Sequence, residues 1–231
     1  MRWILVIVSL AVLPMLARAQ SLLGTGGPSG PVVITPLTQP DLTYTRPDEI
    51  TKIRNYLFDA FGPYPITGAA PTAGFDQVSN APPEWGRSVE GYRERFASDF
   101  GIAGIGTTTR YALSEAVKED TLYYRCECKG VLPRLRHAVI STLTARRGED
   151  GHRVFSFPAL VAPYAGTATA VYGWYPRRCG TKDALRMGNY NLLEYMGGNI
   201  ALEFLYSGPQ SLLTRMHLNN GHGAPNPGLE P

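Results

Sequence analysis

Charged residues are scarce in this chain. Asp, Glu, Lys and Arg make up 18% of its 231 residues, whereas they form about a quarter of an ordinary soluble domain. The apolar content is ordinary at 44%, and there are 25 glycines and 19 prolines. Few charges together with many glycines and prolines indicate close packing, long irregular segments or contact with a membrane.

The short motifs that mark common enzyme classes are absent as well. The sequence has no His-Glu-x-x-His zinc motif, no Walker phosphate loop, no Gly-x-Ser-x-Gly nucleophile elbow and no Cys-x-x-Cys redox motif. Residues 24–30 are rich in glycine, but no strand-to-helix pattern follows them, so we interpret this stretch as a linker. We expect no cofactor, and the leading hypothesis is a non-enzymatic protein.

The first twenty residues carry an apolar run that is shorter than a membrane span. Arg2 gives a positive start, residues 3–16 are almost continuously apolar, and Ala-Arg-Ala then supplies the small residues that a signal peptidase recognises. A spanning helix needs about 20 apolar residues. We therefore predict a signal peptide over residues 1–20, cleaved before Gln20 or Ser21, and an exported protein of the periplasm or outer membrane, or a secreted one.

The charge balance gives no electrostatic reason to expect a nucleic acid partner. The chain has 22 Lys and Arg against 19 Asp and Glu, a formal charge of +3. Removal of Arg2 and Arg18 with the signal leaves 20 against 19. Nucleic-acid binders show a clustered basic surface. The expected partners are instead an envelope protein or a membrane surface.

The mature chain divides into a leader, one domain and a tail. Residues 21–41 and 219–231 are rich in Gly, Pro and small polar residues, and both are predicted to be disordered. Residues 42–218 show mainly helical periodicity. We predict an all-α domain, a compact bundle of about five to six helices.

The helix boundaries follow from caps and apolar spacing. Thr45 is the predicted N-cap of the first helix, and Ile50, Ile53, Leu57 and Phe61 mark one apolar face. Further helices are predicted over residues 66–78, over 88–100, through 111–117 after an interruption at Gly101 and Gly104, from Pro133 to a glycine cap at Gly148, and over 181–206.

The last of these helices contains three glycines, Gly188, Gly197 and Gly198. Glycine weakens a helix interior unless a neighbouring element approaches its bare backbone. We therefore predict that another helix packs against Gly197.

Residues 154–176 contain no charged side chain. Arg153 and Arg177 flank this stretch and aromatic residues lie near both ends, as in the interfacial anchors of a membrane segment. Pro158, Pro163 and several hydroxyl groups make it less apolar than a good membrane span. We favour a central helix that the bundle buries on all sides, and contact with a membrane is the alternative.

The three cysteines are Cys126, Cys128 and Cys179. Cysteines of exported proteins usually pair, and side chains one residue apart rarely reach disulfide geometry. We therefore favour a bridge from Cys179 to either Cys126 or Cys128, with three reduced thiols as the competing state. A metal site that combines the three with His137 is a weaker alternative, because Cys-x-Cys is tighter than the usual zinc spacing.

Two groups of residues are candidates for catalysis. His137 lies within a predicted helix beside its apolar stripe, whereas His222 in the tail is expected to be solvated. Glu84, Glu90 and Glu94 lie close together in sequence, and neighbouring acids suit general acid–base chemistry. A periplasmic hydrolase that uses His137 or these acids is the main alternative. A structural histidine and a solvated helix face are the simpler interpretations.

Several short segments form a recognisable set: Glu84-Trp85-Gly86, Glu90-Gly91-Tyr92, Arg95-Phe96-Ala97-Ser98 and Trp174-Tyr175-Pro176. Together they resemble a family of uncharacterised exported proteins of acidobacterial-type soil bacteria. The similarity covers residues 82–205 and departs at Thr121-Leu122 and Arg93. It implies export and a compact helical domain, and it supplies no activity and no catalytic residue.

Overall fold

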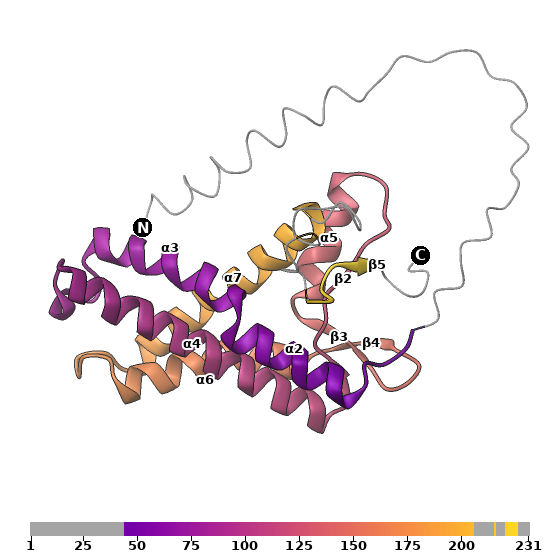
Figure 1. Ribbon diagram of the computed structural model, residues 1–231, viewed down its shortest axis with the longest axis horizontal. Helices are drawn as coiled ribbons and strands as arrows, with labels where there is room; N and C mark the ends of the chain where they lie inside the picture. The colour runs from indigo at the N-terminus through magenta and orange to yellow at the C-terminus, as the bar shows by residue number, and fades with distance from the viewer. Residues whose placement is uncertain (1–43, 206–214, 216–219, 226–231) are drawn as a thin grey trace, which may run out of the picture. The chain divides into compact units, whose positions relative to one another are not determined.

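The computed structural model describes residues 44–205, 215 and 220–225, all within one compact unit of the chain. The chain is mainly helical, as predicted (Figure 1). The helices are α2 (Glu49–Phe61), α3 (Pro63–Ser79), α4 (Val89–Ala116), α5 (Val131–Ser141), α6 (Phe157–Gly173) and α7 (Thr181–Leu205), with a short 3₁₀ turn, η2 (Pro83–Trp85). The predicted signal peptide and leader lie outside the described residues.

Helix α4 is the centre of the helical layer (Figure 1). Helices α2 and α3 follow one another along one side of it and run antiparallel to it. The Tyr56 hydroxyl lies 3.1 Å from that of Thr108, and the Tyr92 hydroxyl donates to the Ala70 carbonyl. Helix α6 lies along the other side, also antiparallel, and α7 packs against α6.

Helix α4 is continuous, so the predicted interruption at Gly101 and Gly104 is wrong. The glycines of α4 mark places where neighbouring elements approach its backbone. A Cβ at Gly104 would lie 3.6 Å from the Ala60 oxygen of α2, and one at Gly106 would lie 3.2 Å from the Ala162 oxygen of α6. Close packing on both sides therefore stabilises the helix through residues that are poor helix formers by themselves.

Helix α2 begins later than expected, because its N-cap is Asp48 and not Thr45. The Asp48 Oδ1 accepts a hydrogen bond of 2.9 Å from the Thr51 backbone N–H. A carboxylate at this position satisfies a free N–H group and interacts favourably with the helix dipole. The low-complexity stretch over residues 66–78 is helical as predicted, within α3.

A small antiparallel sheet replaces the end of the helix that was predicted to reach Gly148. Helix α5 ends at Ser141, and the strands β1 (Glu119–Asp120), β3 (Thr144–Arg147) and β4 (His152–Phe155) pair in the order β1-β3-β4. Gly148 and Gly151 have φ values of +72° and +64° in the turn between β3 and β4. Gly148 is therefore a hairpin residue and not a helix cap.

Helix α6 forms the centre of the uncharged stretch over residues 154–176. The first residues of this stretch belong to β4. The Ser156 Oγ caps α6 by accepting a hydrogen bond from the Ala159 N–H at 3.1 Å. One face of α6 is buried against α4 and α7, but Phe157, Tyr172 and Trp174 are exposed, so the predicted burial on all sides is incomplete. None of the described helices has the length and apolar character needed to cross a bilayer.

The predicted disordered tail is partly ordered. Strand β5 (Ala224–Pro225) pairs in parallel with β2 (Tyr124–Arg125). His222, expected to be solvated, is buried: its Nε2 lies 2.9 Å from Asp59 Oδ2, and its Nδ1 accepts a 3.0 Å hydrogen bond from the Tyr123 N–H. His222 can be buried because a carboxylate distant in sequence and a backbone N–H satisfy both of its ring nitrogens.

Among the glycines of α7, Gly188 and not Gly197 is the site of close packing. The Tyr164 ring of α6 occupies the space that a Cβ at Gly188 would need. No atom of the described residues lies within 4 Å of a Cβ placed at Gly197 or Gly198. The contact between α6 and α7 therefore depends on the glycine nearest the N-terminal end of α7.

Candidate functional site

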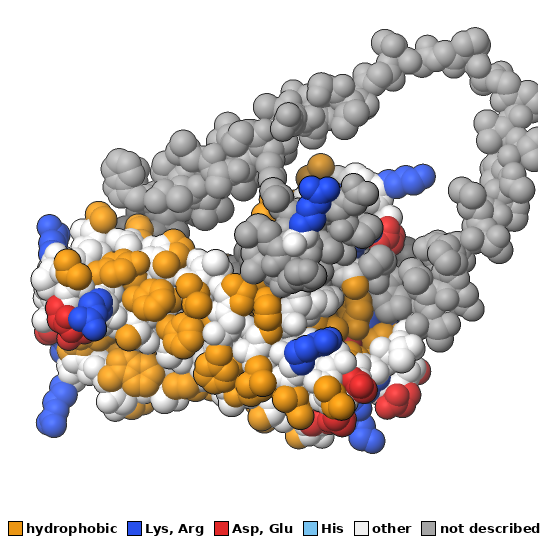
Figure 2. All heavy atoms as spheres, in the orientation of Figure 1, with side chains coloured by type: hydrophobic (Ala, Val, Ile, Leu, Met, Phe, Trp, Pro, Cys, Tyr) orange, Lys and Arg blue, Asp and Glu red, His pale blue; other side chains and the backbone are white. Residues whose placement is uncertain are grey.

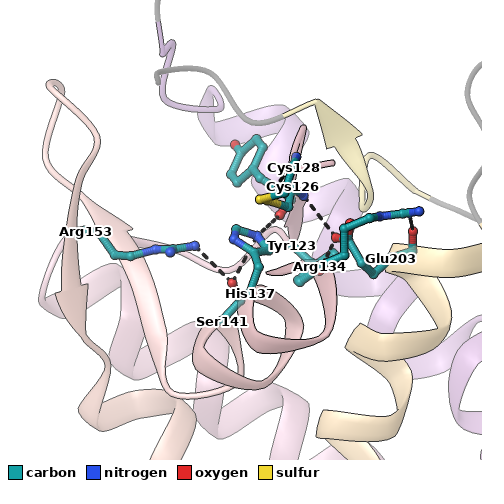
Figure 3. The surroundings of a disulfide bond; sticks show 9 residues. Tyr123, Cys126, Cys128, Arg134, His137, Ser141, Arg153 and Glu203 are labelled. Atoms are coloured by element: carbon teal, nitrogen blue, oxygen red, sulfur yellow. Dashed lines mark hydrogen bonds and ion pairs between the residues drawn. A yellow bond between two sulfur atoms is a disulfide. The ribbon is translucent and has the colours of Figure 1, made fainter. Parts of the chain in front are cut away.

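His137 is held by structural contacts (Figure 3). Its Nε2 lies 2.8 Å from the Tyr124 carbonyl oxygen and 3.3 Å from the Ser141 Oγ, and its ring meets the Tyr123 ring edge-on at 6.0 Å. A carbonyl oxygen can only accept, so Nε2 carries a proton and donates it. The buried ring joins α5 to β2.

Glu203 is a buried carboxylate beside this histidine that the sequence pattern did not reveal (Figure 3). It is fully buried near the end of α7 and accepts hydrogen bonds from the Tyr123 hydroxyl at 2.6 Å, the Cys126 N–H at 3.0 Å and the Arg134 Nε at 2.9 Å. Burial, with the hydrogen bond to Glu203, raises the pKa of the Tyr123 hydroxyl. Three donors satisfy this carboxylate, so Glu203 and its partners link α7 to α5 and to the β2 segment.

The cysteine pairing differs from the favoured one. The structure pairs Cys126 with Cys128, whose Cα atoms lie 5.1 Å apart (Figure 3). Cys179 is free. The Cys126–Cys128 Cα separation falls within the usual disulfide range, and Cys179 follows the far end of α6. The part of the chain that the structure describes contains no group of three or more His, Cys, Asp and Glu arranged to hold a metal.

The three candidate glutamates are not gathered around His137. Glu84 pairs with Arg178, with Oε2 3.2 Å from its NH2, and this pairing lowers the pKa of Glu84. Glu90 pairs with Arg93 at 3.1 Å on the exposed face of α4. Glu94 is exposed on α4. The side chains proposed for a hydrolase therefore lie apart, and the structure does not assemble them into one site.

Three other carboxylates come together between α3, α4 and α7. They are Asp76, Asp99 and Glu194. Burial, reinforced by the charges of Asp76 and Glu194, raises the pKa of Asp99 to about 8, and burial raises the pKa of Asp76 to about 6 against the opposing effect of Arg95. Among the described residues, Asp99 Oδ2 has no hydrogen-bond partner.

Asp59 shows the opposite behaviour in its buried contact with His222. Burial alone would raise its pKa, but the nearby His222 and hydrogen bonds from Tyr111 and Asn220 lower it. The Tyr111 hydroxyl donates to Asp59 at 2.6 Å, and the Asn220 amide donates at 3.0 Å. These contacts link the segment that contains Asn220 and His222 to α2 and α4.

An apolar groove, which we name the α4 groove, runs along α4 on the described surface. It has a volume of about 750 Å³. Its floor is α4 from Glu94 to Thr109, and Glu94 is the one charged residue among the described residues that line it. Figure 2 shows hydrophobic side chains spread over the exposed face of α4 and its neighbours. The composition of the groove suits an apolar occupant.

Small residues form the floor of the α4 groove and aromatic residues form its walls. Ala97, Gly101, Gly104 and Thr108 follow one another at helical spacing along the floor. The walls are Phe61 of α2 on one side and Trp174 at the end of α6 on the other, with Trp85 of η2 also lining the groove. Phe100 and Ile105 of α4 line the groove as well, so the small side chains form one stripe of its lining.

Trp174 is fixed in position at the wall of the groove. Its indole Nε1 donates a 2.9 Å hydrogen bond to the Ser98 Oγ, and its ring atoms lie 3.5 Å from the position of a Cβ at Gly101. Glycine at 101 therefore leaves room for the indole against α4. The groove has a preformed wall, which reduces the ordering cost of binding.

The apolar face predicted for the first helix lies on the surface and meets this groove at Phe61. Ile50, Ile53, Leu57 and Phe61 are 79%, 59%, 52% and 54% exposed. We name these four residues the α2 ridge. The helical period was correctly identified, but the face of α2 toward α4 carries Asn55, Tyr56 and Ala60 instead.

No known protein family, no curated protein and no solved structure matches this chain.

Proposed function

We propose that the chain is an exported, non-enzymatic cell-envelope protein that acts as a helical docking module. The observation that carries the proposal is the open apolar face formed by the α4 groove and the α2 ridge. Contiguous exposed apolar patches larger than a few hundred Å² mark binding surfaces on proteins. The signal-peptide pattern over residues 1–20 supports export, and the family resemblance agrees with it.

The contacts of the candidate catalytic residues favour docking over hydrolysis. His137 donates to a backbone carbonyl, and Glu84 and Glu90 form ion pairs with arginines. The alternative of a hydrolase would gain support from a pocket that gathers His137 with an acid, and no observation favours it. The thiol alternative lacks support in the same way, because Cys179 lies apart from the other two cysteines.

Fractionation of the native host tests the proposal. We expect the protein in the envelope fraction, with Gln20 or Ser21 as the N-terminal residue in mass spectrometry. We also expect Leu57→Arg, which places a charge on the α2 ridge, to change its distribution among envelope fractions. Full-length protein that retains Met1 in the cytoplasm would contradict export. A Leu57→Arg variant that distributes like the wild type would contradict docking by this face.

A further inference from the structure

The α2 ridge and the α4 groove have complementary shapes. The ridge is a convex row of large aliphatic and aromatic side chains, each more than half exposed. The groove is a recess with a floor of Ala97, Gly101, Gly104 and Thr108. Phe61 belongs to both, because it ends the ridge and forms one wall of the groove. A convex and a concave apolar surface therefore meet at Phe61.

From this arrangement we propose that a second copy of this chain occupies the α4 groove, with the α2 ridge of each copy inserted into the groove of the other. The inference rests on the proposed docking role of this face and names the partner. A two-fold interface uses the same patch on both copies and must be self-complementary. An adjacent ridge and groove meet that condition, because rotation about an axis between them exchanges the two.

The lengths of the two features agree with this placement. From Ile50 to Phe61 the ridge rises by roughly 17 Å at about 1.5 Å per residue. From Glu94 to Thr109 the groove floor rises by roughly 22 Å on the same basis. The ridge therefore fits within the groove along its whole length.

The exposed apolar area suits a small, weak dimer interface. The exposed parts of the four ridge side chains amount to on the order of 400 Å² per copy. The groove, where Ala97 and Trp174 are exposed, adds less than the ridge, so two copies together would bury on the order of 1,000 Å², at the low end of specific interfaces. Glu94 lies at one end of the floor, so the centre of the interface would bury no charged groove residue.

Sedimentation velocity of the purified mature chain tests the proposal. We expect a monomer–dimer equilibrium with a dissociation constant on the order of micromolar. Leu57→Arg on the ridge and Ala97→Arg on the groove floor should each weaken the dimer by about 100-fold or more. Both positions are exposed, so the melting temperature of the dilute monomer should stay unchanged.

Leu132→Arg is the matched control. Leu132 on α5 is 75% exposed and lies outside the groove and the ridge, so this variant should dimerise like the wild type. A wild type that remains monomeric up to about 100 µM, or a dimer that neither arginine weakens, would overturn the proposal.

A second assay distinguishes a face that does not dimerise from a face that does not dock at all. The probe is sedimentation with phosphatidylcholine vesicles. If the wild type is monomeric and binds vesicles, and Leu57→Arg removes that binding, self-association is wrong and the same face docks on lipid. If dimerisation, vesicle binding and distribution in the envelope are all unchanged in Leu57→Arg, both the partner and the proposed function are wrong.

Discussion

Replacing Asp99 with Asn should make the protein more stable at pH 8 and leave its stability almost unchanged at pH 4. Asp99 lies in α4 and faces Asp76 of α3 and Glu194 of α7, and Arg95 is the nearby cation that opposes its pKa rise. Tyr175 is also close enough to interact with Asp99. Burial and the two like charges raise the pKa of Asp99 to about 8, whereas an unfolded Asp titrates near 3.9.

The sign and the magnitude follow from linkage. Because the pKa is raised in the folded state, the folded protein binds the proton more tightly than the unfolded chain. The stabilising contribution is complete below about pH 4 and is lost as the pH rises through about 8. A tenfold difference in proton affinity between the two states corresponds to about 1.4 kcal/mol, so the upper limit at pH 8 is about 5 kcal/mol. Relaxation around the ionised carboxylate reduces this, and we expect a difference of about 2–3 kcal/mol.

Urea unfolding of both proteins at pH 4, 6 and 8 measures this effect, with Glu90→Gln as the control. Glu90 is exposed and pairs with Arg93, so its replacement should leave the pH dependence unchanged. The reasoning would be refuted if the wild type and Asp99→Asn lost stability in parallel between pH 4 and 8. It would also be refuted if Asn lowered the stability at pH 8.

Two further predictions concern packing and the buried carboxylate of α7. Gly188→Leu should destabilise the domain by about 2–3 kcal/mol, because the Tyr164 ring fills the space, whereas Gly197→Leu should melt near the wild type; thermal unfolding of both variants checks this. Glu203→Ala should cost about 3 kcal/mol, because it leaves Arg134 and two buried donors without their carboxylate. Glu84→Ala, which removes an exposed ion pair, should cost much less stability in the same urea titration, and equal losses in the two variants would contradict the role of Glu203.

The helices could be predicted because their signals are local. Apolar spacing located α2, and the first turn of α4 follows Ser88, whose Oγ accepts from the Gly91 N–H. The same local reasoning placed a break at Gly101 and Gly104. It was wrong because the groups that stabilise these glycines belong to α2 and α6, which are distant in sequence. Glycine content alone does not distinguish a helix end from a close helix contact.

The candidate site could be predicted only in part. The apolar face of α2 was visible in the sequence, but its exposure depends on which face of α2 meets α4. The pairing of Asp59 with His222 joins residues 163 positions apart, and no local pattern marks it. The predicted cysteine pairing differs from the structure for another reason. It relied on the rule that side chains one residue apart rarely reach disulfide geometry, whereas the backbone brings the Cys126 and Cys128 Cα atoms to 5.1 Å.

Acrylamide quenching of tryptophan fluorescence tests the central claim most directly. The chain has three tryptophans, and Trp85 and Trp174 both line the α4 groove. Trp3 leaves with the proposed signal peptide, so the whole tryptophan signal of the mature chain reports on the groove. If a second copy fills it, quenching should fall and the emission should shift to shorter wavelength as the protein concentration rises, and Leu57→Arg should abolish both changes. Equal quenching of the wild type at every concentration would show that the groove stays open and would contradict the account.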